Sequence, residues 1–348
     1  MTQPGRVAGT LLLALAAALA CAAVGTPLPW MIGPLLACAA VTMAGAPTAA
    51  HPALRNAGQW AIGTSLGLYF TPPVVAVLPA LLPAIAAGVA WALLMGYGFY
   101  RYLWWRHGAD ATLARATAFF AGSIGGASEM ALQAERHGGR VDLVAAGHSL
   151  RVMLVVVAIP FALKATGVHG ADLVLPGVTE VRPLGLAALV GVTLAAVRVF
   201  DRLRFPNPWV LGALLVTMLV TALGAQWSAF PRAVTNAGQL FIGVALGTRF
   251  TPEFARSAPR WIATVAVGTL GMMGASALFG VALAALIGQH PATMVLATSP
   301  GGIAEMSITA KVLQLGVPVV TAFHVVRYLA VLVLTPVLFR WELLRLSR

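Results

Sequence analysis

The sequence predicts an all-α integral membrane protein made of two inverted repeats of five transmembrane helices, each repeat with a re-entrant hairpin or a broken helix. Of the 348 residues, 59% are hydrophobic and 9% are charged, whereas an average soluble domain carries about 25% charged residues. Apolar segments of about 18 to 25 residues match the length of a spanning helix and do not alternate with a period of two. Several motifs also occur twice along the chain.

The charged residues indicate topology signals rather than nucleic-acid binding. The formal net charge is +12, and the basic residues fall singly or in small groups between apolar segments. Such loops are typical of chains sorted across a bilayer, with anionic lipid headgroups as partners. Cys21 and Cys38 lie in apolar stretches and are interpreted as small buried side chains. We expect no cofactor, no metal site and no nucleic-acid partner.

Ten apolar stretches are the expected spans. Those of the first repeat are 7–24, 29–46, 54–71, 80–102 and 141–163. Those of the second are 183–199, 206–224, 233–250, 261–287 and 317–339. The first 25 residues resemble a signal peptide, but the second repeat begins with a similar helix, so 7–24 is interpreted as a retained span. The domains are a membrane repeat 1–165, a periplasmic linker 166–182 and a membrane repeat 183–348.

Two further segments, 111–136 and 292–314, are each interrupted by a glycine pair, which breaks a helix because glycine has no side chain to restrict its backbone. Each segment is either a re-entrant hairpin or a broken crossing helix. Basic residues such as Arg106 and Arg136 stand on both flanks of the first, which favours a hairpin. Ten spans plus two hairpins then place both termini in the cytoplasm. Five spans per repeat is an odd number, so the second repeat is inverted relative to the first.

The motif Gly-Gly-x-x-Glu-Met occurs in both segments and brings Glu129 and Glu305 into the membrane. A charged side chain in the bilayer costs about 2.5 to 3.5 kcal/mol on insertion scales. The functional interpretation is ion coupling, because a desolvated glutamate can titrate near neutral pH. The alternative is a structural one, in which each carboxylate forms a salt bridge or stabilises a helix N-terminus.

Two buried arginines, Arg151 and Arg327, follow histidines His148 and His324 by three residues, so each pair shares one helix face. Arginine binds carboxylates through two parallel hydrogen bonds, which predicts an anionic ligand. Alternatively, each arginine is a fixed counter-charge for a hairpin glutamate. For the histidines, proton relay and a simple interhelical hydrogen bond both remain open.

The candidate site is assembled from both repeats. The expected substrate-binding residues also include free backbone N–H groups beside the glycine pairs, and the full set is Gly125, Gly126, Ser128, Arg151, Ser299, Gly301, Gly302 and Arg327. The expected ion-coupling residues are Glu129, Glu305, His148, His324, Asn56, Gln59, Asn236 and Gln239. For the four amides, interhelical hydrogen bonding is the alternative. The small-residue spacings Gly63/Gly67 and Gly243/Gly247 predict close helix packing.

These motifs resemble a known family. The repeated Asn-Ala-Gly-Gln block, the repeated Pro-Trp-x-x-Gly entry at Pro29 and Pro208, and the Gly-Gly-x-x-Glu-Met motif resemble the AbrB family of bacterial membrane proteins. Its members are sometimes labelled ammonia monooxygenases or membrane regulators. The resemblance implies a fold similar to the cation–proton antiporter and anion transporter group, with inverted repeats and interrupted helices. The monooxygenase label finds no support here, because no ligand-spaced cluster of histidine or cysteine is present.

We therefore expect a secondary active transporter that moves a small organic anion, coupled to H⁺ or Na⁺, by alternating access in a bacterial inner (cytoplasmic) membrane. It is not expected to be an enzyme, and a homodimer is compatible with the sequence. The alternative function is a membrane sensor or regulatory scaffold that affects gene expression through a partner.

Overall fold

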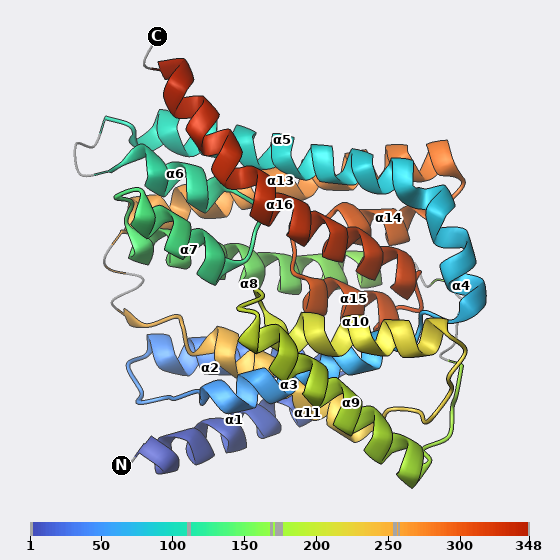
Figure 1. Cartoon of the computed structure of the whole chain (residues 1–348). Coiled ribbons are helices and arrows are strands. Elements are labelled where there is room, and N and C mark those ends of the chain that lie inside the picture. The colour runs from blue at the N-terminus through green and yellow to red at the C-terminus, as the bar shows by residue number, and fades with distance from the viewer. Residues whose placement is uncertain are drawn as a thin grey trace. The chain divides into compact units, whose positions relative to one another are not determined.

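The computed structural model describes residues 3–109, 113–167, 170, 177–252, 256 and 258–346. Every regular element in these residues is a helix (Figure 1). The chain forms two compact units. The first unit comprises Met1–Ala80, Pro160–Glu253 and Ser307–Pro318, and the second comprises Leu81–Ile159, Phe254–Met306 and Val319–Arg348. Each unit therefore contains helices from both predicted repeats, so the compact units cut across the expected divisions 1–165 and 183–348. The expected linker 166–182 lies partly outside the described residues.

The helices of the first unit are α1 (Gln3–Ala23), α2 (Pro29–Met43), α3 (Pro52–Gly67), α4 (Pro72–Val77), α9 (Pro183–Arg202), α10 (Pro208–Ala222) and α11 (Arg232–Gly247). A short 3-10 helix, η1 (Leu78–Leu81), leads into the second unit. That unit holds all or most of α5 (Leu82–His107), α6 (Arg115–Gly122), α7 (Ala127–Arg136), α8 (Val141–Ala165), α13 (Pro259–Ile287), α14 (Pro291–Thr298) and α16 (Val317–Leu346). Helix α15 (Ile303–Val312) begins in the second unit and continues from Ser307 in the first.

Each of the ten predicted spans coincides with a helix. Among the described residues, six stretches are long and apolar enough to cross a membrane: Gln3–Ala23, Pro72–His107, Val141–Ala165, Pro183–Arg202, Pro259–Ile287 and Val317–Arg345. They support a multi-pass protein embedded in a membrane. The helices α2 and α10 are shorter than expected, 15 residues each, because the chain turns at Gly45 (φ 88°) and Gly224 (φ 82°). Glycine adopts this left-handed conformation without strain and ends helices for that reason.

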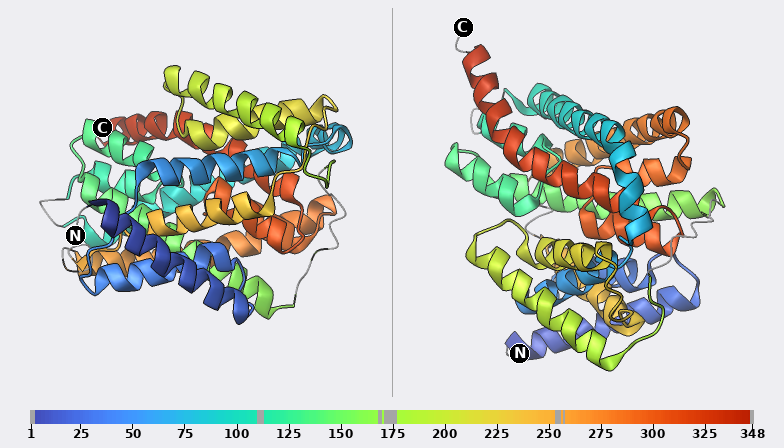
Figure 2. Two further views of the ribbon diagram at one scale, coloured as in Figure 1. Left: turned by 90° about the horizontal axis from the view of Figure 1, so that it is seen from below. Right: turned by 45° about the vertical axis from the view of Figure 1, so that its right-hand side comes forward.

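The first unit packs each repeat against the other. Helix α2 packs on α11, and α3 packs on α10 (Figure 2). Because α10 is the repeat of α2 and α11 is the repeat of α3, these two contacts are equivalent. Where α3 crosses α11, Gly58 and Gly238 of the two Asn-Ala-Gly-Gln blocks meet. A Cβ atom on Gly58 would lie 2.7 Å from the Gly238 carbonyl oxygen, so only glycine fits this approach of two backbones.

The other repeated glycines of the first unit also allow backbones to approach. A Cβ atom on Gly63 would lie 2.5 Å from the Val210 carbonyl oxygen of α10, and one on Gly243 would lie 2.6 Å from the Met31 carbonyl oxygen of α2. Gly67 and Gly247 make the same approaches one turn further along. The predicted close helix packing is therefore confirmed.

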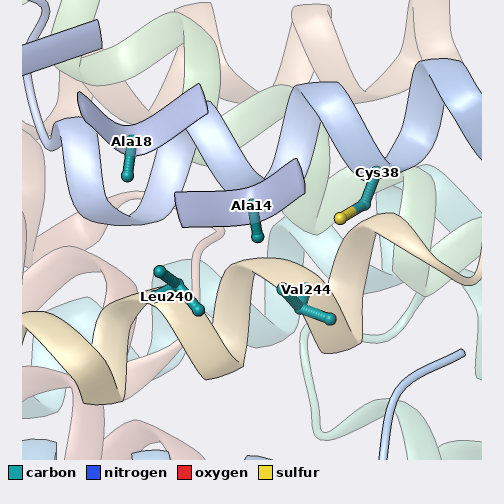
Figure 3. Close-up of a cluster of buried hydrophobic side chains, with 5 residues drawn as sticks. All are labelled: Ala14, Ala18, Cys38, Leu240 and Val244. Atoms are coloured by element: carbon teal, nitrogen blue, oxygen red, sulfur yellow. The ribbon is translucent and has the colours of Figure 1, made fainter. Parts of the chain in front are cut away.

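The apolar core of the first unit includes a small cluster of α1, α2 and α11 (Figure 3). The cluster is formed by Ala14, Ala18, Cys38, Leu240 and Val244. Cys38 is fully buried and its thiol is free, in agreement with its interpretation as a small apolar side chain. Small residues on α1 let this helix lie close to its neighbours.

In the second unit, too, helix contacts of one repeat have equivalents in the other. Helix α5 packs on α6, and its counterpart α13 packs on α14, while α5 and α13 also pack on each other. These long helices thus pack on α6 and α14, which directly precede the two glycine pairs.

Candidate functional site

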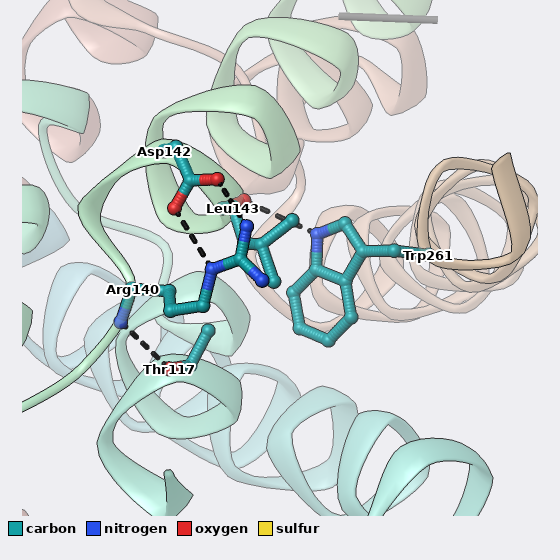
Figure 4. Close-up of polar contacts among 5 residues, drawn as sticks. All are labelled: Thr117, Arg140, Asp142, Leu143 and Trp261. Carbon is teal, nitrogen blue, oxygen red and sulfur yellow. Dashed lines mark hydrogen bonds and ion pairs between the residues drawn. The ribbon is translucent and has the colours of Figure 1, made fainter. Parts of the chain in front are cut away.

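Both predicted helix interruptions are present. Helix α6 ends at Gly122 and α7 begins at Ala127, while α14 ends at Thr298 and α15 begins at Ile303. The chain doubles back between α6 and α7, because the Arg140 backbone N–H, just after α7, donates to Thr117 Oγ1 in the first turn of α6 at 2.9 Å (Figure 4). We call Arg115–Arg136 the first interrupted segment and Pro291–Val312 the second.

Arg151 of α8 holds the first interrupted segment through backbone carbonyl groups. Its side chain is 2% exposed. One terminal nitrogen donates to the Ser123 carbonyl oxygen at 3.0 Å and is 3.4 Å from that of Ala121. The other donates to Nδ1 of His148 at 2.7 Å. The guanidinium thus satisfies carbonyl groups at the C-terminal end of α6, which have no partner within the helix.

Arg327 of α16 repeats this arrangement on the second interrupted segment. Its terminal nitrogens donate to the carbonyl oxygens of Ser299 and Gly301. It also donates to Nδ1 of His324 at 2.9 Å. The C-terminal end of a helix carries a partial negative charge, so each arginine lies where backbone geometry favours a cation.

The two histidines are held in one tautomer. Because a guanidinium can only donate, Nδ1 of each histidine must accept and carries no proton. The remaining nitrogen, Nε2, lies 2.9 Å from a backbone carbonyl oxygen, that of Phe120 for His148 and that of Leu296 for His324. A carbonyl can only accept, so Nε2 carries the proton and both rings are neutral. The predicted sharing of one helix face by each His–Arg pair is confirmed.

The terminal nitrogens of Arg151 and Arg327 donate to backbone carbonyl oxygens and to histidines. The alternative in which each arginine is a fixed counter-charge for a hairpin glutamate stays a prediction. The Nε atoms of Arg151 and Arg327 are buried without a hydrogen-bond partner. Arg151 is 2% exposed and Arg327 is 6% exposed. The second unit therefore buries two positive charges at its helix interruptions.

The glutamates lie instead over the N-terminal ends of the second half-helices. Glu129 is the third residue of α7, and its Oε2 would lie 2.0 Å from a Cβ atom on Gly126. Glu305, the third residue of α15, lies 2.1 Å from the same point on Gly302. A carboxylate here is favoured by the helix dipole. The second glycine of each pair leaves room for this carboxylate, which would have to move if a Cβ atom were added there.

The first glycine of each pair serves the methionine of the motif. A Cβ atom on Gly125 would lie 3.0 Å from Met130 Cε, and one on Gly301 would lie 2.6 Å from Met306 Cγ. Both methionine side chains are fully buried. The motif Gly-Gly-x-x-Glu-Met therefore encodes one local structure, in which methionine packs under the first glycine and glutamate covers the second.

A tyrosine that was not among the predicted site residues distinguishes the surroundings of Glu129. Tyr328, the residue after Arg327, packs beside Gly126, and its hydroxyl lies near the Glu129 carboxylate without reaching hydrogen-bond geometry. The equivalent position of the first repeat is Val152, which has no polar group. The only signal in the sequence was this tyrosine-for-valine difference directly after a repeated arginine.

The predicted serines have different roles. Ser299 is buried, and its hydroxyl donates to the Leu296 carbonyl oxygen at 2.8 Å. Its structural equivalent is Ser123, which donates to the Phe119 carbonyl oxygen at 3.0 Å and was not among the predicted site residues. Ser128 is exposed in the first turn of α7. The repeated serines that contact the arginines through their carbonyl groups are thus Ser123 and Ser299.

The predicted amides lie in the first unit, on α3 and α11, whereas the arginines, histidines and glutamates lie in the second. The side-chain amides of Asn56, Gln59, Asn236 and Gln239 form no hydrogen bond with the described residues. The first unit instead contains a polar contact that the sequence analysis missed, in which Lys311 Nζ donates to Ser65 Oγ at 2.7 Å. Lys311 lies in the last turn of α15.

The fold and the site define a multi-pass helical membrane protein with two equivalent interrupted segments. The chain belongs to the AbrB family, whose model, described as "Transition state regulatory protein AbrB", matches residues 30–342. It is 27% identical to the Bacillus subtilis (strain 168) protein named "Uncharacterized protein YhjN", over 91% of this chain and 88% of that protein. It is 23% identical to "Putative regulator AbrB" of Escherichia coli (strain K12), over 92% of this chain and 91% of that protein. No solved structure matches the chain.

Proposed function

We propose that the protein is a secondary active transporter that moves a small organic anion coupled to H⁺ or Na⁺. The observation that carries this proposal is the pair of buried guanidinium groups of Arg151 and Arg327, 2% and 6% exposed, which donate to neutral groups, namely backbone carbonyls and histidines. Two positive charges inside a membrane domain are costly. An anion close to both would lower that cost.

The half-helix N-termini supply the second element of the site. Free backbone N–H groups and the helix dipole make such ends binding sites for anions, and transporters place substrate carboxylates there. In this structure Glu129 and Glu305 cover these ends of α7 and α15. The ground state is therefore one in which the protein's own carboxylates lie where a substrate carboxylate would bind.

This competition gives a mechanism for coupling. An ionised glutamate and a substrate carboxylate repel each other, so both cannot lie at one helix N-terminus. Protonation of the glutamate, or a bound Na⁺, removes its negative charge and makes anion binding favourable. Substrate and cation then cross together. In this mechanism the arginines hold the interrupted segments in place through backbone carbonyls and provide the positive field.

The membrane arrangement is part of the same proposal. Two inverted repeats of five spans, with re-entrant hairpins entering from opposite faces and both termini in the cytoplasm, would expose the site to each side in turn. The division of the chain into two compact units supports a cycle in which one unit carries the site. The proposed location is the bacterial inner membrane, and the proposal contains no enzymatic step.

The test is flux in proteoliposomes with a panel of carboxylates and imposed pH or Na⁺ gradients. Glu129→Gln and Glu305→Gln should each reduce gradient-driven flux at least tenfold. Glu135→Gln is the matched control, because Glu135 is exposed on the same helix as Glu129 and its loss should leave flux unchanged. If Glu129→Gln and Arg151→Ala both leave flux of the identified substrate intact, the site assignment is wrong.

The regulatory scaffold is the competing function. It predicts that no ligand of a broad anion screen shifts the melting temperature and that a stable cytoplasmic partner is recovered with the purified protein. A substrate-dependent shift that is lost in Glu129→Gln and retained in Glu135→Gln would favour transport.

A further inference from the structure

A second site lies at one end of the long helices of the second unit. A cavity of about 830 Å³ is formed where α5 ends and where α8 and α13 begin. Its lining includes the basic side chains Arg106, Arg140 and Arg260. This cavity takes no part in the proposed transport site, which is built on the interrupted segments.

The cavity is strongly cationic. Among the described residues no acidic side chain lines it, and the nearby Asp142 already pairs with Arg140 at 2.6 Å (Figure 4). Arg106 and Arg260 are exposed and have no acidic partner among the described residues. The first turns of α8 and α13 add the positive ends of two helix dipoles. The charge is therefore suited to a ligand with a phosphate group.

The walls of the cavity are held by specific contacts. Trp261 is 3% exposed, and its ring N–H donates to the Leu143 carbonyl oxygen at 3.1 Å (Figure 4). His107 Nε2 lies 2.9 Å from Thr264 Oγ1, and its ring packs edge-on against Trp261. The cavity is thus preformed by ordered side chains at the junction of three helices.

One wall of the cavity continues onto apolar surface. Val267 lines the cavity and is 61% exposed, and Leu270, on the same face of α13 three residues later, is 53% exposed. Helix α13 is long and apolar enough to span a membrane, so this face is suited to acyl chains. A ligand that fits both parts has an anionic head and an apolar tail.

We propose that this cavity binds the phosphate headgroup of an anionic phospholipid, with the acyl chains lying along Val267 and Leu270. Basic pockets between spanning helices bind such headgroups in membrane proteins. Through Arg140, whose backbone N–H is bonded to Thr117, a bound lipid would also stabilise the base of the first interrupted segment.

The test uses the purified full-length protein in detergent, with thermal unfolding measured as lipid is added. Short-chain phosphatidylglycerol should raise the melting temperature more than phosphatidylcholine of equal chain length. Glycerol phosphate at equal concentration should have little effect, because it lacks the acyl chains. Equal stabilisation by glycerol phosphate would assign the site to a soluble phosphate and overturn the lipid proposal.

Arginine variants test whether stabilisation by phosphatidylglycerol depends on this cavity. The double variant Arg106→Gln/Arg260→Gln should weaken phosphatidylglycerol binding at least tenfold while melting as the wild type does in phosphatidylcholine. The control Arg198→Gln/Arg202→Gln removes the same charge from the exposed end of α9 and should bind as the wild type does. If both double variants bind phosphatidylglycerol alike, the proposal is wrong. If the first double variant does not fold, the single change Arg260→Gln is measured instead, with the same criterion.

Discussion

The two interrupted segments hold their helix ends in the same way but surround their glutamates differently. In both, an arginine donates to carbonyl groups at the end of the first half-helix and to a neutral histidine. Beside Glu129 stands Tyr328, whereas the equivalent residue of the other repeat is Val152. The shared contacts satisfy buried backbone groups, which neither segment can leave unpaired.

This comparison shows which parts of the two repeats can differ without loss of the fold. Hydrogen bonds to buried carbonyls are a structural requirement, and the bonds of each arginine to a serine carbonyl, Ser123 or Ser299, and to a histidine recur in both repeats. The surroundings of a carboxylate decide when it is charged, and they can differ between the repeats without loss of the fold. We infer that the arginine–histidine clusters are equivalent, whereas the two glutamates have different functions.

The largest effect is expected for Arg151→Ala and Arg327→Ala. Each leaves two buried carbonyl groups and a histidine nitrogen without a donor, so each should lower the free energy of unfolding by about 3 kcal/mol or more. Thermal unfolding in detergent measures this, and Arg140→Ala, on an exposed ion pair, should cost about 1 kcal/mol or less. If only one of the two arginine variants lowers the free energy of unfolding, the two segments are not structurally equivalent.

The next largest effect on stability is expected for the histidine variants. His148→Ala and His324→Ala should each cost about 1 to 3 kcal/mol, because a buried carbonyl and an arginine N–H lose their partner. Glutamine at either position supplies both an acceptor and a donor and should recover part of the stability. Unfolding of both pairs of variants, compared at one pH, is the measurement. A histidine whose replacement by alanine costs nothing would contradict the hydrogen bonds described above.

The second glycines should affect function more than stability. In Gly126→Ala and Gly302→Ala, the new Cβ meets a carboxylate at the end of a flexible side chain, which can move away at a cost of about 1 kcal/mol. Gly58→Ala should cost more, because its Cβ meets a backbone carbonyl that cannot move. Flux should fall in Gly126→Ala and remain in a control such as Gly98→Ala, whose Cβ meets open space.

The smallest effect distinguishes the glutamates. Tyr328→Phe should change stability by less than about 1 kcal/mol, since the hydroxyl makes no hydrogen bond. In a double-mutant cycle, Tyr328→Phe should couple to Glu129→Gln and should be additive with Glu305→Gln. The pH profile of flux is the second measurement. Equal coupling to both glutamates would show that the repeats are functionally alike.

Much of the local structure could be predicted from spacing. Glycine pairs marked both helix interruptions, and a three-residue spacing placed His148 and Arg151 on one face, because both are properties of a few consecutive residues. The partners of the arginines could not be predicted in this way. The Ser123 carbonyl is 28 residues from Arg151, and every residue carries a carbonyl, so sequence chemistry pointed to the rarer carboxylates instead.

By itself, the sequence determined the membrane class, the positions of the helices and the duplication, because these follow from hydropathy, glycine and repeated motifs along the chain. Only the tertiary structure decided that α2 packs on α11 and α3 on α10, so that each compact unit draws on both repeats. It also decided that the glutamates cover helix N-termini while the arginines hold helix C-termini. The physical reason is that these contacts depend on which backbones approach closely, and that depends on the whole fold.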